Sequence, residues 1–299
     1  MINGILNVYK EKGFTSHDVV AKLRGILKQK KIGHTGTLDP DAEGVLPVCL
    51  GNATKLCDML ADKSKTYETV LQLGVETDTQ DMSGTILEEN PVECTMEEIQ
   101  RVVMEFVGEY AQIPPMYSAK KISGKKLYEL AREGKVVERK PSMVQIHSID
   151  ILDIDMENAR ISMRVDCSKG TYIRTLCHDI GQKLGCKGAM QSLLRTRVSN
   201  FCLKDSLRLC EIEARKEDKD FMDVIQPPDK VFEEYSAITV LESAERLLYN
   251  GNGITKKMIA EITEGKKEQF RVYDSKQQFV AVYYWDEEKK IYKPRKMFL

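Results

Sequence analysis

Residues 33–46 read Gly33-His34-Thr35-Gly36-Thr37-Leu38-Asp39-Pro40-Asp41-Ala42-Glu43-Gly44-Val45-Leu46. Two glycines, two threonines and a histidine make up the first five positions, which predicts a tightly turned loop with its backbone close to another part of the molecule. Pro40 disfavours the helical region for the residue before it, so we expect the Asp39 carboxylate to stand on an extended backbone.

Three interpretations of this loop compete. A calcium-binding loop would need glutamate at its twelfth position, but the twelfth residue from Asp39 is Leu50, and Pro40 and Pro47 interrupt the segment. A phosphate-binding loop would need Gly-Lys followed by Ser or Thr, a motif that the segment lacks. A structural role, in which Asp39 merely caps the next turn, stays open from these residues alone.

The composition is that of an ordinary globular protein. The chain has 299 residues, a formal net charge of −1, and 42% hydrophobic residues, and this length predicts one large domain followed by a small one. No apolar run approaches the roughly 18 residues of a membrane span, and the N-terminus lacks a signal pattern, so we expect a cytoplasmic protein without membrane association. The eight cysteines form no Cys-x-x-Cys pair, so we expect small buried side chains and no metal site.

Basic residues are concentrated in two places although the total charge is near zero. One group lies within residues 118–140 and consists of Lys120, Lys121, Lys125, Lys126, Arg132, Lys135, Arg139 and Lys140. The other group lies within residues 22–31. Charge separated in this way can steer a polyanion to one face, but a solvated surface would have the same composition, so both interpretations stay open.

Periodic patterns predict interspersed helices and strands. A helix should follow Ser16 as its cap, a second should begin at the capping box of Thr95 and Glu98 and close at Gly108, and a third should stop at Gly185. The expected strands are 65–75, 161–165, 237–240, 268–273, 279–284 and a last one from 291, with a turn-rich connector over 215–234. The large domain is therefore mixed α/β or α+β, since no regular βα repeat is present.

The 33–40 segment, followed by Glu43-Gly-Val-Leu-Pro47, resembles the signature of the TruB family, the tRNA pseudouridine(55) synthases. Further segments match the family in its order: Gly4–Leu6, Lys10–Ser16, Lys65–Tyr67, Thr77–Thr79 with Asp81 and Gly84, Pro114-Pro115 with Tyr117–Ala119, Gly124 with Leu127-Tyr128 and Ala131-Arg132, Cys167–Arg174 and Leu193–Arg197. Such an ordered set is far more specific than a lone motif. Two positions depart from the pattern: Glu11 replaces a usual proline, and Leu194 replaces a common arginine that could contact phosphate.

The resemblance implies an α+β pseudouridine synthase fold with a central mixed, mainly antiparallel sheet flanked by helices. Residues 1–235 would form the catalytic domain, with an RNA-clamping insertion at 118–140, and residues 236–299 a small PUA-like β-barrel that binds RNA. The family flips uridine 55 out of the T loop of tRNA and isomerises it to pseudouridine. No cofactor or metal is used, and we expect a monomer whose partner is the tRNA T stem-loop, with no obligatory protein partner.

The resemblance also assigns residues to the site. Asp39 matches the catalytic aspartate, a carboxylate that can form and later leave a covalent adduct. Arg174 matches the arginine paired with it, and we expect a bidentate guanidinium that orients the carboxylate and keeps it ionised. Tyr67 matches the tyrosine that stacks on the flipped base. The expected substrate-binding residues are His34, Thr37, Tyr172, Leu193, Lys120, Lys121, Lys125 and Lys126.

Two alternatives to a free-standing tRNA enzyme are considered. A related enzyme that works inside a guide-RNA particle would carry added partner surfaces and basic tails, and this chain shows no such tail. A non-catalytic RNA-binding or RNA-folding protein on the same scaffold would not need the combination of Asp39, Tyr67 and Arg174. The two roles of modifying and folding tRNA can coexist in one protein.

Overall fold

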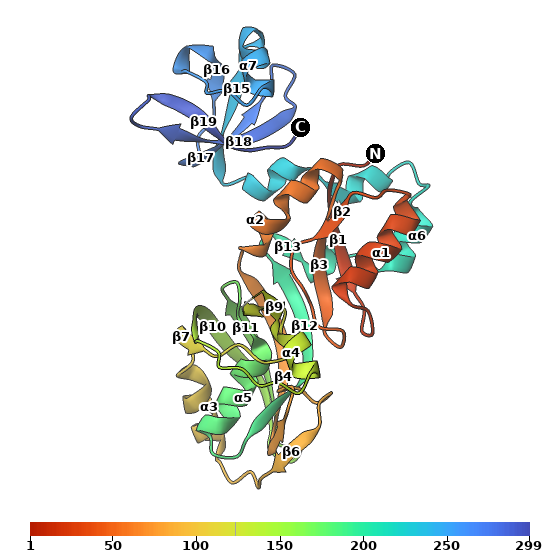
Figure 1. The fold of residues 1–299 in the computed structure, drawn as a ribbon, viewed down its shortest axis with the longest axis vertical. Coiled ribbons are helices and arrows are strands. Elements are labelled where there is room, and N and C mark those ends of the chain that lie inside the picture. Colours follow the sequence, from red (N-terminus) through yellow and green to blue (C-terminus); the bar gives the residue numbers. More distant parts are fainter. Residues whose placement is uncertain (123) are drawn as a thin grey trace.

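A ten-stranded sheet is the main element of the computed structural model, which describes residues 1–122 and 124–299 (Figure 1). Its strands follow the order β14-β1-β3-β12-β4-β11-β10-β7, with β2 beside β3 and β13 beside β12. The strands are β1 (Gly4–Lys10), β2 (Ile32–His34), β3 (Glu43–Leu50), β4 (Lys65–Leu73), β7 (Gly108–Gln112), β10 (Ser142–Asp155), β11 (Arg160–Cys167), β12 (Gly188–Val198), β13 (Phe201–Cys202) and β14 (Ile225–Gln226). Among the described pairs, β12 and β3 run parallel and the others antiparallel. The prediction of a mixed, mainly antiparallel sheet is confirmed.

A short seam between β3 and β12 joins the two halves of this sheet. Leu194 pairs with Glu43, and Arg195 pairs with Gly44. Gly44 has a φ of 106°, and a Cβ atom at this position would lie 2.2 Å from the carbonyl oxygen of Arg195. The close approach therefore requires glycine, and it fixes the end of the loop that carries Asp39 against β12.

Helices cover the two halves of the sheet separately. The helices of this part are α1 (Ser16–Leu27), α2 (Cys57–Ala61), α3 (Met96–Met104), α4 (Leu127–Arg132), α5 (Ile173–Lys183) and α6 (Leu209–Arg215). Helices α1 and α6 pack with apolar residues of β1 and β3, whereas α3 and α5 pack with those of β4, β10 and β11. Two pairs of short strands form separate two-stranded ribbons, β5 (Val75–Thr77) with β6 (Ile86–Glu89) and β8 (Lys121–Ile122) with β9 (Lys125–Lys126). Within the described ranges, no helix is long and apolar enough to cross a membrane.

Helix ends differ from the predictions at two places. Thr15, not Ser16, caps α1 through a capping box, and Ser16 is the first helical residue, with its side chain buried. The predicted capping box at Thr95 does begin α3. This helix ends at Met104, however, because the chain turns before Gly108, which opens β7 instead of closing the helix.

A second sheet forms the C-terminal part of the chain and lies at one end of the molecule (Figure 1). Its order is β16-β15-β17-β18-β19, and it carries the short helix α7 (Glu245–Tyr249). The strands are β15 (Tyr235–Val240), β16 (Ile259–Ile262), β17 (Lys266–Tyr273), β18 (Phe279–Asp286) and β19 (Ile291–Met297). Four of these strands were expected, and β16, a short edge strand with little burial, was not.

The C-terminal sheet has its own core, but it also shares apolar contacts with the large domain. Phe232, in the connector, packs against Phe279 and Phe298, with ring centroids 6.3 and 6.2 Å apart. Val282 belongs to the same buried cluster as Ile5 of β1. The two parts of the chain therefore stabilise each other across this contact.

Candidate active site

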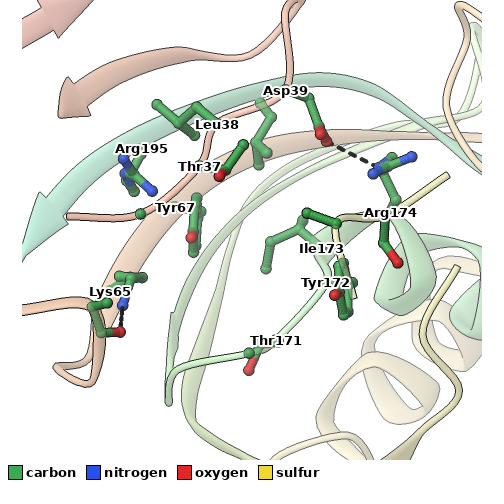
Figure 2. Close-up of a pocket in the computed structure, with 16 residues that line it drawn as sticks. Thr37, Leu38, Asp39, Lys65, Tyr67, Thr171, Tyr172, Ile173, Arg174 and Arg195 are labelled. Carbon is green, nitrogen blue, oxygen red and sulfur yellow. Dashed lines mark hydrogen bonds and ion pairs between the residues drawn. The ribbon is translucent and has the colours of Figure 1, made fainter. Parts of the chain in front are cut away.

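A cavity of about 250 Å³ opens where the Asp39 loop, β4, β12 and the start of α5 meet (Figure 2). It is lined by Gly36, Thr37, Leu38, Asp39, Ala61, Lys65, Tyr67, Ser118, Ala119, Gly170, Thr171, Tyr172, Ile173, Arg174, Leu193 and Arg195. The three predicted catalytic residues are all in this lining. So are three predicted substrate-binding residues, namely Thr37, Tyr172 and Leu193.

The loop that carries Asp39 is anchored on both sides of this residue. The Ser16 hydroxyl accepts a hydrogen bond from the Leu38 backbone nitrogen at 2.9 Å, which ties the loop to the start of α1. Lys10 is fully buried at the end of β1, and its Nζ donates to the Ala42 carbonyl oxygen at 2.6 Å. Burial lowers the pKa of Lys10 to about 8. These contacts hold Asp39 in place before any substrate binds, which lowers the entropic cost of reaction.

Arg174 joins Asp39 to two other segments from the first turn of α5. Its Nε lies 3.1 Å from Oδ2 of Asp39 (Figure 2). Its Nη1 donates to the Thr79 carbonyl oxygen at 3.2 Å and lies 3.6 Å from Oδ2 of Asp81, while its Nη2 donates to the Tyr117 carbonyl oxygen at 2.8 Å. The expected bidentate contact is therefore wrong, because the terminal nitrogens face backbone carbonyl groups and Asp39 is approached through Nε.

The environment of Asp39 favours its neutral form more than water does. Burial raises the pKa of the Asp39 carboxyl, Arg174 opposes this shift, and the nearby Asp81 adds to it. The Arg174 side chain is 6% exposed, whereas the Asp39 side chain is 40% exposed. The carboxylate therefore has one side against a buried cation and another part open to the cavity.

Tyr67 stands on β4 beside Arg195 of β12, because the two residues are direct cross-strand partners. Both are buried, with 7% of Tyr67 and 1% of Arg195 exposed. Burial raises the pKa of the Tyr67 phenol, and the Arg195 guanidinium lowers it. Arg195 Nε donates to the Val45 carbonyl oxygen at 2.7 Å, across the seam of the sheet.

Gln112 fixes the backbone of Tyr172 just before α5. The Gln112 side chain is buried at the end of β7; its Oε1 accepts from the Tyr172 nitrogen at 2.7 Å and its Nε2 donates to the Tyr172 carbonyl oxygen at 2.9 Å. This pair of bonds positions the turn that leads into Arg174. Leu193 lies on β12 and packs against the main apolar core, so it gives the cavity an apolar wall.

The other predicted binding residues lie outside the cavity lining. His34 stands in β2 and packs edge-on against His17, with ring centroids 5.2 Å apart, and burial lowers the pKa of its imidazole. Lys120, Lys121, Lys125 and Lys126, the insertion lysines, lie in or next to the β8–β9 ribbon. Residue 123, in the middle of the predicted insertion, lies outside the described residues. The insertion reaches the cavity itself through Ser118 and Ala119.

The insertion lysines differ in how closely their ammonium groups contact other protein groups. Lys120 donates to the Ser142 hydroxyl at 2.5 Å, and Lys125 lies 3.7 Å from Glu133. Lys121 is exposed. Such lysines on a short projecting ribbon can reach a phosphate backbone without rearrangement of the sheet below.

Three charged residues near the cavity were not assigned a role from the sequence: Lys65, Asp81 and Arg195. Lys65 Nζ donates to the Ala61 and Lys63 carbonyl oxygens at 2.8 and 2.7 Å, and burial lowers its pKa to about 8. All three residues stand in segments that resemble the family. The presence of a charged residue inside such a segment could have indicated that these three residues lie near the site.

Comparison with known proteins covers most of the chain. The family model "TruB family pseudouridylate synthase (N terminal domain)" matches residues 24–173, and "tRNA pseudouridylate synthase B C-terminal domain" matches residues 174–233. The chain is 55% identical to the tRNA pseudouridine synthase B of Lachnoclostridium phytofermentans over 100% of both proteins. It is 49% identical to that of Alkaliphilus oremlandii over 85% of this chain and 83% of the relative.

Solved structures also resemble this chain over nearly its full length. A Cbf5-Nop10-Gar1 complex contains a chain with a TM-score of 0.75 and 28% identity, covering 99% of this chain and 85% of that one. An H/ACA RNP bound to a substrate RNA containing 2'-deoxyuridine gives a TM-score of 0.74 and 26% identity, with the same coverage of the two chains.

Proposed function

This chain belongs to the TruB family of pseudouridylate synthases and is a tRNA pseudouridine synthase, and we propose that it isomerises uridine 55 in the T loop of tRNA. The observation that carries the proposal is the cavity whose lining holds both the Asp39–Arg174 pair and Tyr67 (Figure 2). A carboxylate held by a cation at the mouth of a base-sized, partly apolar cavity suits a reaction at a flipped nucleotide.

The reaction starts with removal of the uridine from the folded loop, which costs a few kcal/mol. The base enters the cavity between Tyr67 and the apolar wall at Leu193. Asp39 then acts on the nucleotide while the bond between N1 of the base and C1′ of the sugar breaks. The base turns, its C5 forms the new bond to C1′, the proton on C5 leaves, and N1 gains a proton, so substrate and product are isomers. Because Asp39 stands on a loop anchored by Ser16 and Lys10, little reorganisation precedes the chemistry.

RNA binding is assigned to two regions outside the cavity. Residues 118–140 act as the RNA clamp, since the insertion lysines project near Ser118 and Ala119 of the cavity lining. Residues 236–299 act as a PUA-like RNA-binding domain beside a catalytic domain of residues 1–235. In the C-terminal sheet, the Lys256 ammonium lies 5.0 Å from the centre of the Trp285 ring, a pairing of cation and aromatic surface that suits RNA. The protein acts as a monomer with no obligatory protein partner.

A free-standing enzyme is favoured over a guide-RNA particle component. The relatives named tRNA pseudouridine synthase B share 49% and 55% identity with this chain. The chains solved in particle complexes share 26% and 28%. The greater similarity to the first group supports tRNA as the direct substrate, and the arrangement of Asp39 and Arg174 supports catalysis over binding alone.

The test is incubation of the purified protein with an unmodified tRNA transcript, followed by mapping of pseudouridine at single-nucleotide resolution. We expect modification at position 55, none in a transcript with cytidine at that position, and none with the Asp39→Asn variant. Pseudouridine at another position would contradict the proposed target. A folded protein that binds tRNA and forms no pseudouridine would contradict the proposed activity.

A further inference from the structure

Arg195 is a buried cation whose hydrogen-bonding capacity is only partly used. Its side chain is 1% exposed, it lines the cavity, and its Nε donates to the Val45 carbonyl oxygen at 2.7 Å. Among the described residues, its buried Nη2 has no hydrogen-bond partner. Across the β12–β4 ladder, the Arg195 guanidinium faces the Tyr67 phenol. This neighbour is a neutral hydroxyl group and not a carboxylate that would balance the charge.

The other cations of the cavity have partners that account for them. Arg174 lies 3.1 and 3.6 Å from the carboxylates of Asp39 and Asp81. The Lys65 ammonium donates to two carbonyl oxygens. Arg195 therefore adds positive charge to the inner side of the cavity, on the side of Tyr67 and away from the Asp39–Arg174 pair (Figure 2).

An unpaired charge in this position is costly to the folded protein. Transfer of a cation from water into a protein interior costs several kcal/mol when no opposite charge compensates it. A hydrogen-bond donor left unpaired in a buried site adds to this cost. A buried, unpaired cation in the lining of a cavity is therefore a candidate for interaction with charge that develops during a reaction.

We propose that Arg195 is a catalytic residue that stabilises the negative charge on the detached uracil base, an inference that rests on the function proposed above. When the bond between N1 and C1′ breaks, its electron pair stays with the base, which becomes an anion with its charge spread over N1 and the two ring carbonyl oxygens. The sugar carbon C1′ loses that electron pair, and the Asp39 carboxylate takes the place of the base in a temporary bond. When C5 attacks C1′, the bond to Asp39 breaks and the electron pair of the anion forms the new C–C bond, so the base is neutral. The C5 proton then leaves and N1 gains a proton, so the base stays neutral.

In this role, the part of the Arg195 guanidinium that lines the cavity donates to a carbonyl oxygen of the base. Donors that are already in place and excluded from water stabilise an anion without reorganisation at the moment of reaction. The guanidinium is held on the rigid seam of the sheet by the Val45 carbonyl oxygen, so its position does not depend on a loop. A purely structural arginine would instead serve to hold Tyr67 or the seam in place.

The two roles respond differently to the leaving base. Fluorine at C5 withdraws electrons and makes the detached base a more stable anion, so a 5-fluorouridine substrate needs less help from a cation. Single-turnover loss of the original N-glycosidic bond at position 55 would be measured with saturating enzyme. The substrates are transcripts that carry uridine or 5-fluorouridine at that position. The variants are Arg195→Met, Arg195→Lys and, as the matched control, Arg197→Met.

Arg197 suits the control because it is also an arginine of β12 but pairs with Asp166 at 2.6 Å and does not line the cavity. We expect Arg195→Met to slow bond loss about 100-fold with uridine, as for removal of one oxyanion donor. With 5-fluorouridine we expect it to slow bond loss by about tenfold or less. Arg195→Lys should fall between Arg195→Met and wild type on both substrates. Arg197→Met should change both rates by the same small factor.

Equal slowing of both substrates by Arg195→Met would overturn the proposal and leave Arg195 a structural residue. A rate within threefold of wild type would overturn it as well. If Arg195→Met does not fold, as judged by its thermal transition, the same two-substrate ratio is measured with Arg195→Gln, and an unchanged ratio there overturns the proposal. None of these outcomes affects the proposed function, which fails only if the wild-type protein forms no pseudouridine at position 55.

Discussion

Replacement of Arg174 by lysine tests whether the geometry of this residue, and not its charge alone, is needed for activity. The guanidinium contacts four groups in three segments: Asp39 through Nε, the Thr79 carbonyl oxygen and Asp81 through Nη1, and the Tyr117 carbonyl oxygen through Nη2. A lysine ammonium is a compact point charge that cannot reach three separated directions at once. Arg174→Lys therefore keeps the charge but gives up most of these contacts.

The expected loss follows from the contacts that lysine cannot replace. A hydrogen bond from a charged donor contributes about 1.5–3 kcal/mol. If the ammonium keeps its contact with Asp39, the bonds to Thr79 and Tyr117 are lost, which gives about 3 kcal/mol at the lower end. At about 1.4 kcal/mol for each factor of ten, this corresponds to a loss on the order of 100-fold in rate. We expect the loss in the chemical step, because these contacts are made within the protein and position Asp39.

The assay is single-turnover pseudouridine formation with enzyme in excess, together with tRNA binding measured separately. Arg164→Lys is the matched control, since Arg164 also contacts a carboxylate, donating to Glu68 through Nε and Nη2, but on the exposed surface of the sheet. We expect Arg164→Lys to stay within about twofold of wild type, because exposed ion pairs contribute about 0–1 kcal/mol. A single-turnover rate for Arg174→Lys within threefold of wild type would refute the reasoning.

Four further predictions concern separate parts of the molecule. Asp39→Asn should form no pseudouridine while its tRNA affinity stays within about tenfold of wild type, because one carboxylate contributes little to a phosphate-dominated interface; multiple turnover by this variant would contradict its assignment. Reversal of the four insertion lysines to glutamate should weaken tRNA binding and flatten its dependence on salt, measured as the slope of log affinity against log salt concentration; an unchanged slope would return them to a solvated surface. Because the pKa of Asp39 is raised, its ionised form should be lost as pH falls through a value above the ordinary Asp pKa of about 3.9. The single-turnover rate should therefore fall on the acid side at a pH above that value, and Asp81→Asn should move this fall to lower pH because Asp81 raises the pKa of Asp39. No movement would show that the fall in rate belongs to another group. A chain ending at residue 234 should still unfold cooperatively but at a lower temperature, because Phe232 loses its partners in the C-terminal sheet and burial of one such side chain contributes about 1.5–3 kcal/mol; a truncated protein with the full-length melting temperature would show that the contact stabilises neither part.

Features encoded by neighbouring residues were predictable from the sequence. The capping box at Thr95 begins a helix as expected, because both partners lie within four residues. The strand at 160–167 and the helix after Gly170 follow from their periods. Family resemblance then brought Asp39, Tyr67 and Arg174 to one cavity, a placement that periodicity alone could not give.

Features that depend on contacts distant in the chain were missed. Arg195 and Tyr67 become neighbours through the register of β12 against β4, and no local pattern encodes this register. The sequence predicts that both terminal nitrogens of Arg174 contact Asp39. In the structure these nitrogens donate to the carbonyl oxygens of Thr79 and Tyr117. Both carbonyl groups lie in turns whose backbone course the sequence does not predict. The sequence predicts Ser16 as the helix cap because a serine stands just before the apolar pattern. In the structure, its hydroxyl instead accepts a hydrogen bond from the Leu38 backbone nitrogen.

The position of the seam between β3 and β12 explains why these distant contacts gather at the site. The half of the sheet with β1 and β3 supplies the Asp39 loop, and the half with β4 and β12 supplies Tyr67, Leu193 and Arg195. The halves meet where Gly44 touches Arg195, and Arg195 also bonds to Val45 on the opposite side. Any side chain at position 44 would push the halves apart and displace Asp39 relative to the other residues that line the cavity.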